Sequence, residues 1–183
     1  IGIHLTMTSE WGKYRWKPLT NGKTLVDEEG YMWHESDQVE KNVDLEEARA
    51  EIKAQIERCK KLGFVTPSHL DNHMGSLYGI ETGRFELLQM TLETAAEYGL
   101  PFRMPGNVTD AMMGNSMLDI NVDKSLIEMV FGKILDFAKM NKVAIPDYLI
   151  PNEWGGPQDE SYENFVEYVY DLYANLPEGI TET

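Results

Sequence analysis

The 183-residue sequence has one cysteine and comparatively few basic side chains. A single cysteine, Cys59, excludes an intrachain disulfide framework and is typical of a reducing cytoplasm. Sixteen lysines and arginines stand against 31 aspartates and glutamates, which gives a formal net charge of -15. A protein that neutralises nucleic-acid phosphates needs a basic face, so this charge balance argues against a nucleic-acid partner. We therefore expect a cytoplasmic protein whose ligands are sugars or other small molecules.

Three further patterns are missing from the sequence. No apolar run approaches the roughly 20 residues of a transmembrane helix, so we expect no membrane partner. Neither G-x-G-x-x-G nor G-x-x-x-x-G-K-[ST] occurs, and no nucleophile elbow is present, which leaves nucleotide and serine-hydrolase folds without motif support. Apolar residues at 42% and charged residues at 26% are typical of a globular chain, and the length predicts one domain over residues 1–183. Homo-oligomer formation is left open.

The segment from Pro67 to His73 holds two of the four histidines. If residues 68–72 form a strand, side chains alternate between its faces, so His69, Asp71 and His73 point the same way. Imidazole nitrogens and a carboxylate on one face suit a divalent metal ion. The alternative reading of this spacing is a hydrogen-bonded end of a loop.

A second candidate histidine lies near the start of the chain. Ile1, Ile3 and Leu5 alternate with polar or small residues, which predicts a strand with His4 on the face opposite the isoleucines. A histidine in that position is either a satisfied polar side chain or a metal ligand.

Three residues are candidates for substrate binding. Trp11 belongs to segment 9–43, where aromatic residues alternate with turn residues and no periodicity is clear, and Trp154 belongs to the loop 151–157. Flat rings on long loops are platforms for sugar rings, although such rings also pin loops to a core. Arg103 lies in a short apolar run between prolines, where its charge must meet an acidic group, a carbonyl or a ligand.

Helical and strand patterns alternate along the chain. Helices are predicted over 44–63, 85–99, 126–138 and 162–176, and the first has the Asp44 and Glu47 spacing of a capping box. Strands are predicted over 1–5, 68–72, 101–105, 148–150 and 179–183. The alternation predicts an α/β fold with a mainly parallel sheet, either open or closed into a barrel, and ligands at the carboxyl ends of the strands.

Four features together carry a resemblance to a known family: Gly2-Ile3-His4-Leu5, Gln55, His69-Leu70-Asp71-Asn72-His73 and Tyr98-Gly99-Leu100-Pro101-Phe102-Arg103. Over nearly the whole chain the series resembles the YdjC-like (ChbG/HpnK) carbohydrate deacetylases. The resemblance implies a distorted TIM-like (β/α) barrel and removal of N-acetyl groups from acetylated amino sugars or chitooligosaccharides. It also implies a divalent metal ion, Mg or Zn, held by His4 and His73. Asp71 is then the candidate catalytic base, or the group that orients a histidine through its far ring nitrogen.

The sequence departs from the family pattern at three places. The family's N-A-D-D-F-G strand, which supplies a metal ligand and a catalytic carboxylate, has no counterpart here. Gly75 and Leu77 stand where two further histidines are expected, and residues 179–182 stop short of the family's His-Pro motif. We therefore expect a partial deacetylase domain that is poorly active by itself. Two alternatives remain: a metal-free sugar-binding module, and a TIM-like metal enzyme acting on phosphorylated sugars.

Overall fold

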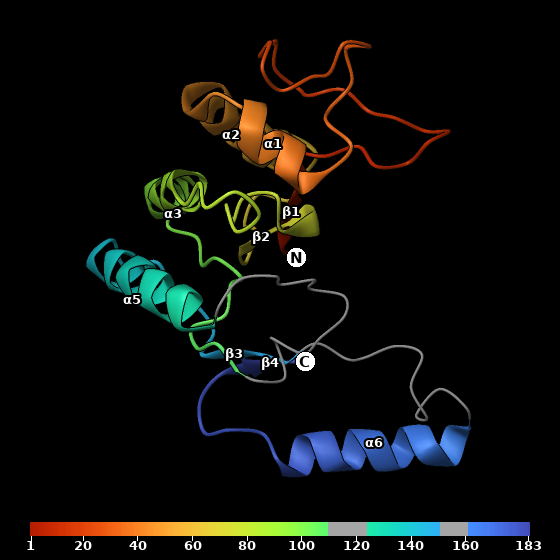
Figure 1. The fold of residues 1–183 in the computed structure, drawn as a ribbon, viewed down its shortest axis with the longest axis vertical. Helices are drawn as coiled ribbons and strands as arrows, with labels where there is room; N and C mark the ends of the chain where they lie inside the picture. Colours follow the sequence, from red (N-terminus) through yellow and green to blue (C-terminus); the bar gives the residue numbers. More distant parts are fainter. Residues whose placement is uncertain (110–123, 151–160) are drawn as a thin grey trace. The chain divides into compact units, whose positions relative to one another are not determined.

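A computed structural model describes residues 1–109, 124–150 and 161–183, which Figure 1 draws as a ribbon. The chain groups into two compact units. Unit 1 comprises residues 1–103 and 134–144, and unit 2 comprises residues 104–133 and 145–183. Each unit is described by itself, and a single domain over the whole chain stays a prediction.

The centre of unit 1 is a pair of parallel strands, β1 (Ile3–Leu5) and β2 (Leu70–Asn72). Ile3 and Leu5 are buried while His4 is exposed, as the alternation in the sequence predicts. The register pairs His4 with Asp71. Both strands end where predicted, at Leu5 and Asn72, but each begins two residues later than predicted. After Asn72 the chain enters the short 3-10 turn η1 (His73–Gly75).

Parallel pairing continues beyond β2 in unit 1. Leu70 forms a parallel bridge with Phe102, whose N–H donates to the carbonyl of Ala144 at 3.0 Å. Phe102 is fully buried, which places the predicted run 101–105 beside the strand pair as a single bridge instead of a full strand. A mixed α/β architecture with parallel strands is thus confirmed in the part of the chain that the structure describes.

Helices α2 (Leu45–Lys61) and α3 (Glu86–Tyr98) pack against each other, and α2 also contacts β1 (Figure 1). Asp44 caps α2 by accepting hydrogen bonds from the N–H groups of Glu46 and Glu47. The reciprocal half of the predicted capping box is wrong: the Glu47 carboxylate turns away and accepts from the N–H and hydroxyl groups of Thr24. Cys59, on α2, is partly exposed.

Segment 9–43 contains one helix that periodicity did not predict, α1 (Ser36–Asn42). Upstream of it, residues 9–35 form no helix (Figure 1), and side chains of α2 hold this stretch by hydrogen bonds. The Glu51 carboxylate, which is fully buried, accepts from the N–H groups of Leu19 and Thr20 at 3.0 and 2.9 Å. Because these contacts are to backbone atoms, they fix the path of the loop.

Unit 2 holds a second parallel pair, β3 (Tyr148–Leu149) with β4 (Thr181–Glu182), and each lies within a predicted strand. The Asp147 carboxylate accepts from the N–H of Ile180 at 2.8 Å and so anchors the approach to β4. Helix α6 (Tyr162–Ala174) begins at Ser161, whose hydroxyl accepts from the N–H of Asn164. The remaining described helix, α5 (Lys124–Met140), belongs to unit 2 up to residue 133 and to unit 1 from residue 134. No helix within the described ranges is both long enough and apolar enough to cross a membrane.

Candidate active site

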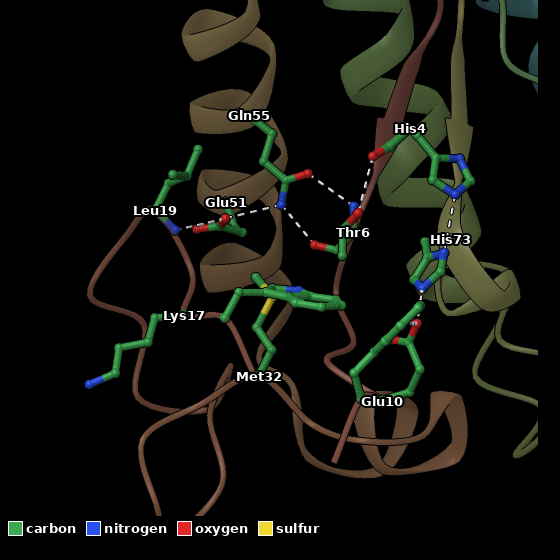
Figure 2. Close-up of a pocket in the computed structure, with 11 residues that line it drawn as sticks. His4, Thr6, Glu10, Lys17, Leu19, Met32, Glu51, Gln55 and His73 are labelled. Carbon is green, nitrogen blue, oxygen red and sulfur yellow. Dashed lines mark hydrogen bonds and ion pairs between the residues drawn. The ribbon is translucent and has the colours of Figure 1, made fainter. Parts of the chain in front are cut away.

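A cavity of about 440 Å³ opens in unit 1 at the carboxyl ends of β1 and β2 (Figure 2). This volume falls in the range of about 300–1,000 Å³ that is typical of ligand pockets. One side of the cavity carries His4, His73 and Glu10, and α2 supplies Glu51 and Gln55 on another. The other lining residues come from the segment that follows β1: Thr6, Trp11, Trp16, Lys17, Leu19 and Met32.

His4 is held by the strand pair beneath it. Its Nδ1 lies 2.5 Å from Oδ1 of Asp71, its register partner on β2. The His4 side chain is 57% exposed, whereas Asp71 is 20% exposed, so the carboxylate lies beneath the ring and fixes it from the protein side. The opposite nitrogen, Nε2, faces the cavity and lies 3.1 Å from Nδ1 of His73.

His73 is positioned by the turn that follows β2. The Ser76 hydroxyl donates to the His73 carbonyl at 2.9 Å, and the N–H of Leu77 donates to the Asn72 side chain at 3.1 Å. This turn ends the strand and turns the His73 ring toward His4, with ring centroids 5.2 Å apart. Two histidines 69 residues apart in sequence are thereby brought into direct contact.

Glu10 holds the other side of His73. Its Oε1 lies 2.9 Å from His73 Nε2 and also accepts from the indole N–H of Trp11 at 2.8 Å. Burial alone would raise the pKa of the Glu10 carboxyl, but hydrogen bonds from its own backbone N–H, from His73 and from Trp11 hold that pKa below its ordinary value. Glu10 is therefore an anion that favours a proton on the far nitrogen of His73.

The four groups form one chain: Asp71, His4, His73, Glu10. If each carboxylate takes a hydrogen bond from the nearer imidazole, His4 Nδ1 and His73 Nε2 carry the protons. The two nitrogens that face each other then both present lone pairs. Such a contact at 3.1 Å is repulsive unless a proton or a cation lies between the lone pairs or beside both of them.

The spacing of the two nitrogens fits two neighbouring ligands of one metal ion. Ligand nitrogens each about 2.0–2.1 Å from zinc lie about 2.9 Å apart at a right angle and about 3.4 Å apart at the tetrahedral angle. The observed 3.1 Å falls between these values. Carboxylates on the far nitrogens are the usual partners of metal-binding histidines. The described residues hold no group of three or more His, Cys, Asp and Glu side chains arranged to hold a metal ion.

The substrate-binding candidates occupy different places. Trp11 lines the cavity and is 64% exposed. Arg103 is not among the cavity-lining residues. Its backbone N–H donates to the Leu70 carbonyl at 2.8 Å, and its backbone carbonyl accepts from the Tyr78 hydroxyl at 3.0 Å. Trp154 lies outside the described residues.

His69 is not among the residues that line the cavity. Its ring packs directly on Gly2, where no Cβ would fit, and its Nδ1 contacts the Ser68 hydroxyl. Strand β2 spans only three residues, with His69 directly before it and His73 directly after it in the turn. Sequence reasoning also missed Glu10, whose contact with His73 spans 63 residues; the adjacent Trp11 was the nearest signal.

Comparison with known proteins places this chain in a family. The chain belongs to the YdjC-like family, because the model described as YdjC-like protein matches residues 1–183. A carbohydrate deacetylase from Thermus thermophilus is 38% identical over 100 residues, which is 55% of this chain and 35% of that protein. A carbohydrate deacetylase from Enterococcus faecalis is 40% identical over 103 residues, or 56% of this chain and 37% of that protein.

A solved structure resembles the chain along almost all of its length. The crystal structure of a candidate cellobiose-phosphate cleavage protein from Enterococcus faecalis V583 matches with a TM-score of 0.61 and 26% identity. The match covers 99% of this chain and 57% of that one. The chain thus spans little more than half the length of this structural relative.

Proposed function

We propose that this chain forms part of a hydrolase that removes N-acetyl groups from acetylated amino sugars or chitooligosaccharides with the help of a divalent metal ion, Mg or Zn. The observation that carries the proposal is the contact of His4 Nε2 with His73 Nδ1 at 3.1 Å, with a carboxylate on the far nitrogen of each ring. The deacetylases among its relatives support the reaction class.

In this proposal His4 and His73 hold the ion through the two facing nitrogens. When bound, a divalent ion supplies Lewis acidity toward the acetamide carbonyl and toward water. Asp71 and Glu10 keep the ring protons on the far nitrogens, so that both facing nitrogens are free to donate. Asp71 stays the candidate base of the motif, but its short contact with His4 favours an orienting role.

The cavity offers a fitting place for a sugar ring. Trp11 and Trp16 contribute aromatic surface, and Leu19 and Met32 contribute aliphatic surface. Sugar rings have apolar C–H faces and polar edges, so a partly apolar wall next to polar groups suits them. Arg103 and Trp154 stay proposed substrate-binding residues.

The architecture and setting of the whole protein belong to the same proposal. Family membership supports a distorted TIM-like barrel as the fold to which the parallel strands contribute. A cytoplasmic location, the absence of nucleic-acid and membrane partners, and an open oligomeric state remain expectations from composition.

A second candidate, action on a phosphorylated sugar, is favoured by two observations. The structural relative is described as a candidate cellobiose-phosphate cleavage protein. In addition, Lys17 is a basic residue among those that line the cavity, with its Nζ 5.1 Å from the centroid of the Tyr31 ring.

Acetate release from N-acetylated chitooligosaccharides, measured on the chain with added Zn or Mg and again with chelator, tests the proposal. We expect weak release with metal, because the chain by itself is expected to be poorly active, and no release with chelator. Release that ignores chelator would remove the metal mechanism. Sugar binding with neither metal binding nor release would favour a binding module, and turnover restricted to phosphorylated sugars would favour the second candidate.

A further inference from the structure

The Gln55 side chain on α2 is fully engaged at the cavity wall. Its Oε1 accepts from the N–H of Thr6 at 3.0 Å, and its Nε2 donates to the carbonyl of Thr6 at 2.8 Å (Figure 2). The same Nε2 donates to Oε1 of Glu51 at 3.0 Å. One side-chain amide therefore satisfies both backbone groups of a residue that lies two positions after His4.

This pairing occurs at the edge of β1 that faces away from β2. Successive residues of a strand direct their backbone groups to opposite edges, and the N–H of Ile3 donates to the His69 carbonyl on the β2 side at 2.9 Å. Thr6 lies three residues after Ile3, so its backbone N–H and carbonyl groups point to the opposite edge of the strand. There the Gln55 amide presents an acceptor and a donor, as the backbone of a neighbouring strand would.

Glu51 determines the orientation of the Gln55 side-chain amide. The Glu51 carboxylate is fully buried and can only accept hydrogen bonds, one of them from the N–H of Leu19. An amide rotated by a half turn would set its oxygen against the Thr6 carbonyl and the Glu51 carboxylate, and its NH₂ against the Thr6 N–H. All three neighbours thus require the same orientation, which makes the arrangement rigid.

We propose that Gln55 is a positioning residue for His4, acting by fixing the end of β1 in place of a neighbouring strand. The connection is short, because the Thr6 hydroxyl also donates to the His4 carbonyl at 3.2 Å. Backbone freedom at Thr6 would move the His4 ring relative to Asp71 and His73. The inference uses the proposed metal site for its functional meaning, while the placement of the His4 ring is measurable without metal.

The test compares Gln55→Met, which keeps the length of the side chain but removes the amide, with two controls. Gln89→Met removes a Gln amide on α3 whose Nε2 bonds Glu93 outside the cavity. Ile56→Val lowers stability from a fully buried position beside Gln55 on the same helix. The readouts are the ¹⁵N signals of the imidazoles, amide exchange at Thr6, and the Kd for Zn²⁺, all measured on the complete chain.

For Gln55→Met we expect displaced His4 ring signals, amide exchange at Thr6 about tenfold faster, and a Zn²⁺ Kd about tenfold weaker, the lower end of the loss known for supporting residues. Both controls should leave all three unchanged. If Gln55→Met does not fold, Gln55→Glu keeps the acceptor for Thr6 and should displace the same His4 signals. A folded variant with unaltered His4 signals overturns the inference. If the wild type binds no zinc, the metal proposal fails, and the imidazole signals still decide the role of Gln55.

Discussion

Asp71 Oδ1 and His4 Nδ1 lie 2.5 Å apart, and the two residues are direct partners in the register of β1 and β2. Parallel strands lie about 4.8 Å apart, so side chains of paired residues meet without any loop having to order. The backbone ladder thus sets the direction of the His4 ring before any ligand arrives. Preorganisation of this kind lowers the cost of binding an ion.

Replacement of Asp71 by asparagine should weaken zinc binding by about tenfold or more, because the amide keeps the shape but loses the charge that holds the proton on His4 Nδ1. Isothermal titration calorimetry measures the change. Asp37→Asn is the matched control, since Asp37 pairs with Lys41 on the surface of α1. Equal affinities for wild type and Asp71→Asn would rule out the orienting role.

His4→Ala and His73→Ala should each lose most bound metal, because each removes one of the two facing nitrogens. His34→Ala should retain it, since His34 is absent from the cavity lining. Metal content of the purified variants decides the matter. Loss of metal from His34→Ala alone would place the ion elsewhere.

Trp11→Ala should weaken binding of N-acetylated chitooligosaccharides by about 1 kcal/mol, or about fivefold, through loss of an aromatic face at the cavity. Tyr14→Ala serves as control, because Tyr14 is 74% exposed and does not line the cavity. Sugar affinity is measured by calorimetry. A greater loss for Tyr14→Ala would move the sugar platform to a different part of the segment.

Acid should weaken the contact between α2 and α3. The hydrogen bond from Arg49, at 2.6 Å, holds the pKa of Glu93 below its ordinary value of 4.5. A carboxylate with a lowered pKa in the folded state contributes stability above its ordinary pKa and loses that contribution as pH falls through the lower value. The difference in Tm between wild type and Glu93→Gln should therefore be constant near neutral pH and shrink below about pH 4.5. In an Arg49→Met background the same difference should be smaller at neutral pH; an unchanged difference would contradict the pairing.

The sequence predicts the elements whose cause is local. Alternation of Ile3, His4 and Leu5 specifies β1, and Asp44 with a three- and four-residue apolar repeat specifies α2, because burial and capping act over a few residues. The positions of His4 and Asp71 within their elements also follow from local pattern. That they meet depends on the register between strands, which the local pattern leaves open.

Two features escaped sequence reasoning for physical causes. Helix α1 has seven residues, too few for a clear period, and starts where Gln38 Oε1 accepts from the N–H groups of His34 and Glu35. Glu10 reaches His73 only because the loop after β1 returns along the cavity, a path set by tertiary contacts. Strand β2 begins at Leu70, two residues later than predicted, and ends at Asn72 as predicted.

The hydrogen bonds of Glu51 hold the course of the chain at the cavity wall whichever side chains stand there. The Glu51 carboxylate accepts hydrogen bonds from the backbone N–H groups of Leu19 and Thr20. Every residue except proline has such an N–H group. Position 19 therefore tolerates exchange without a change in the course of the chain, and its side chain is among those that line the cavity. Single substitutions at position 19 should therefore change which ligands the cavity binds and leave His4 and His73 in place.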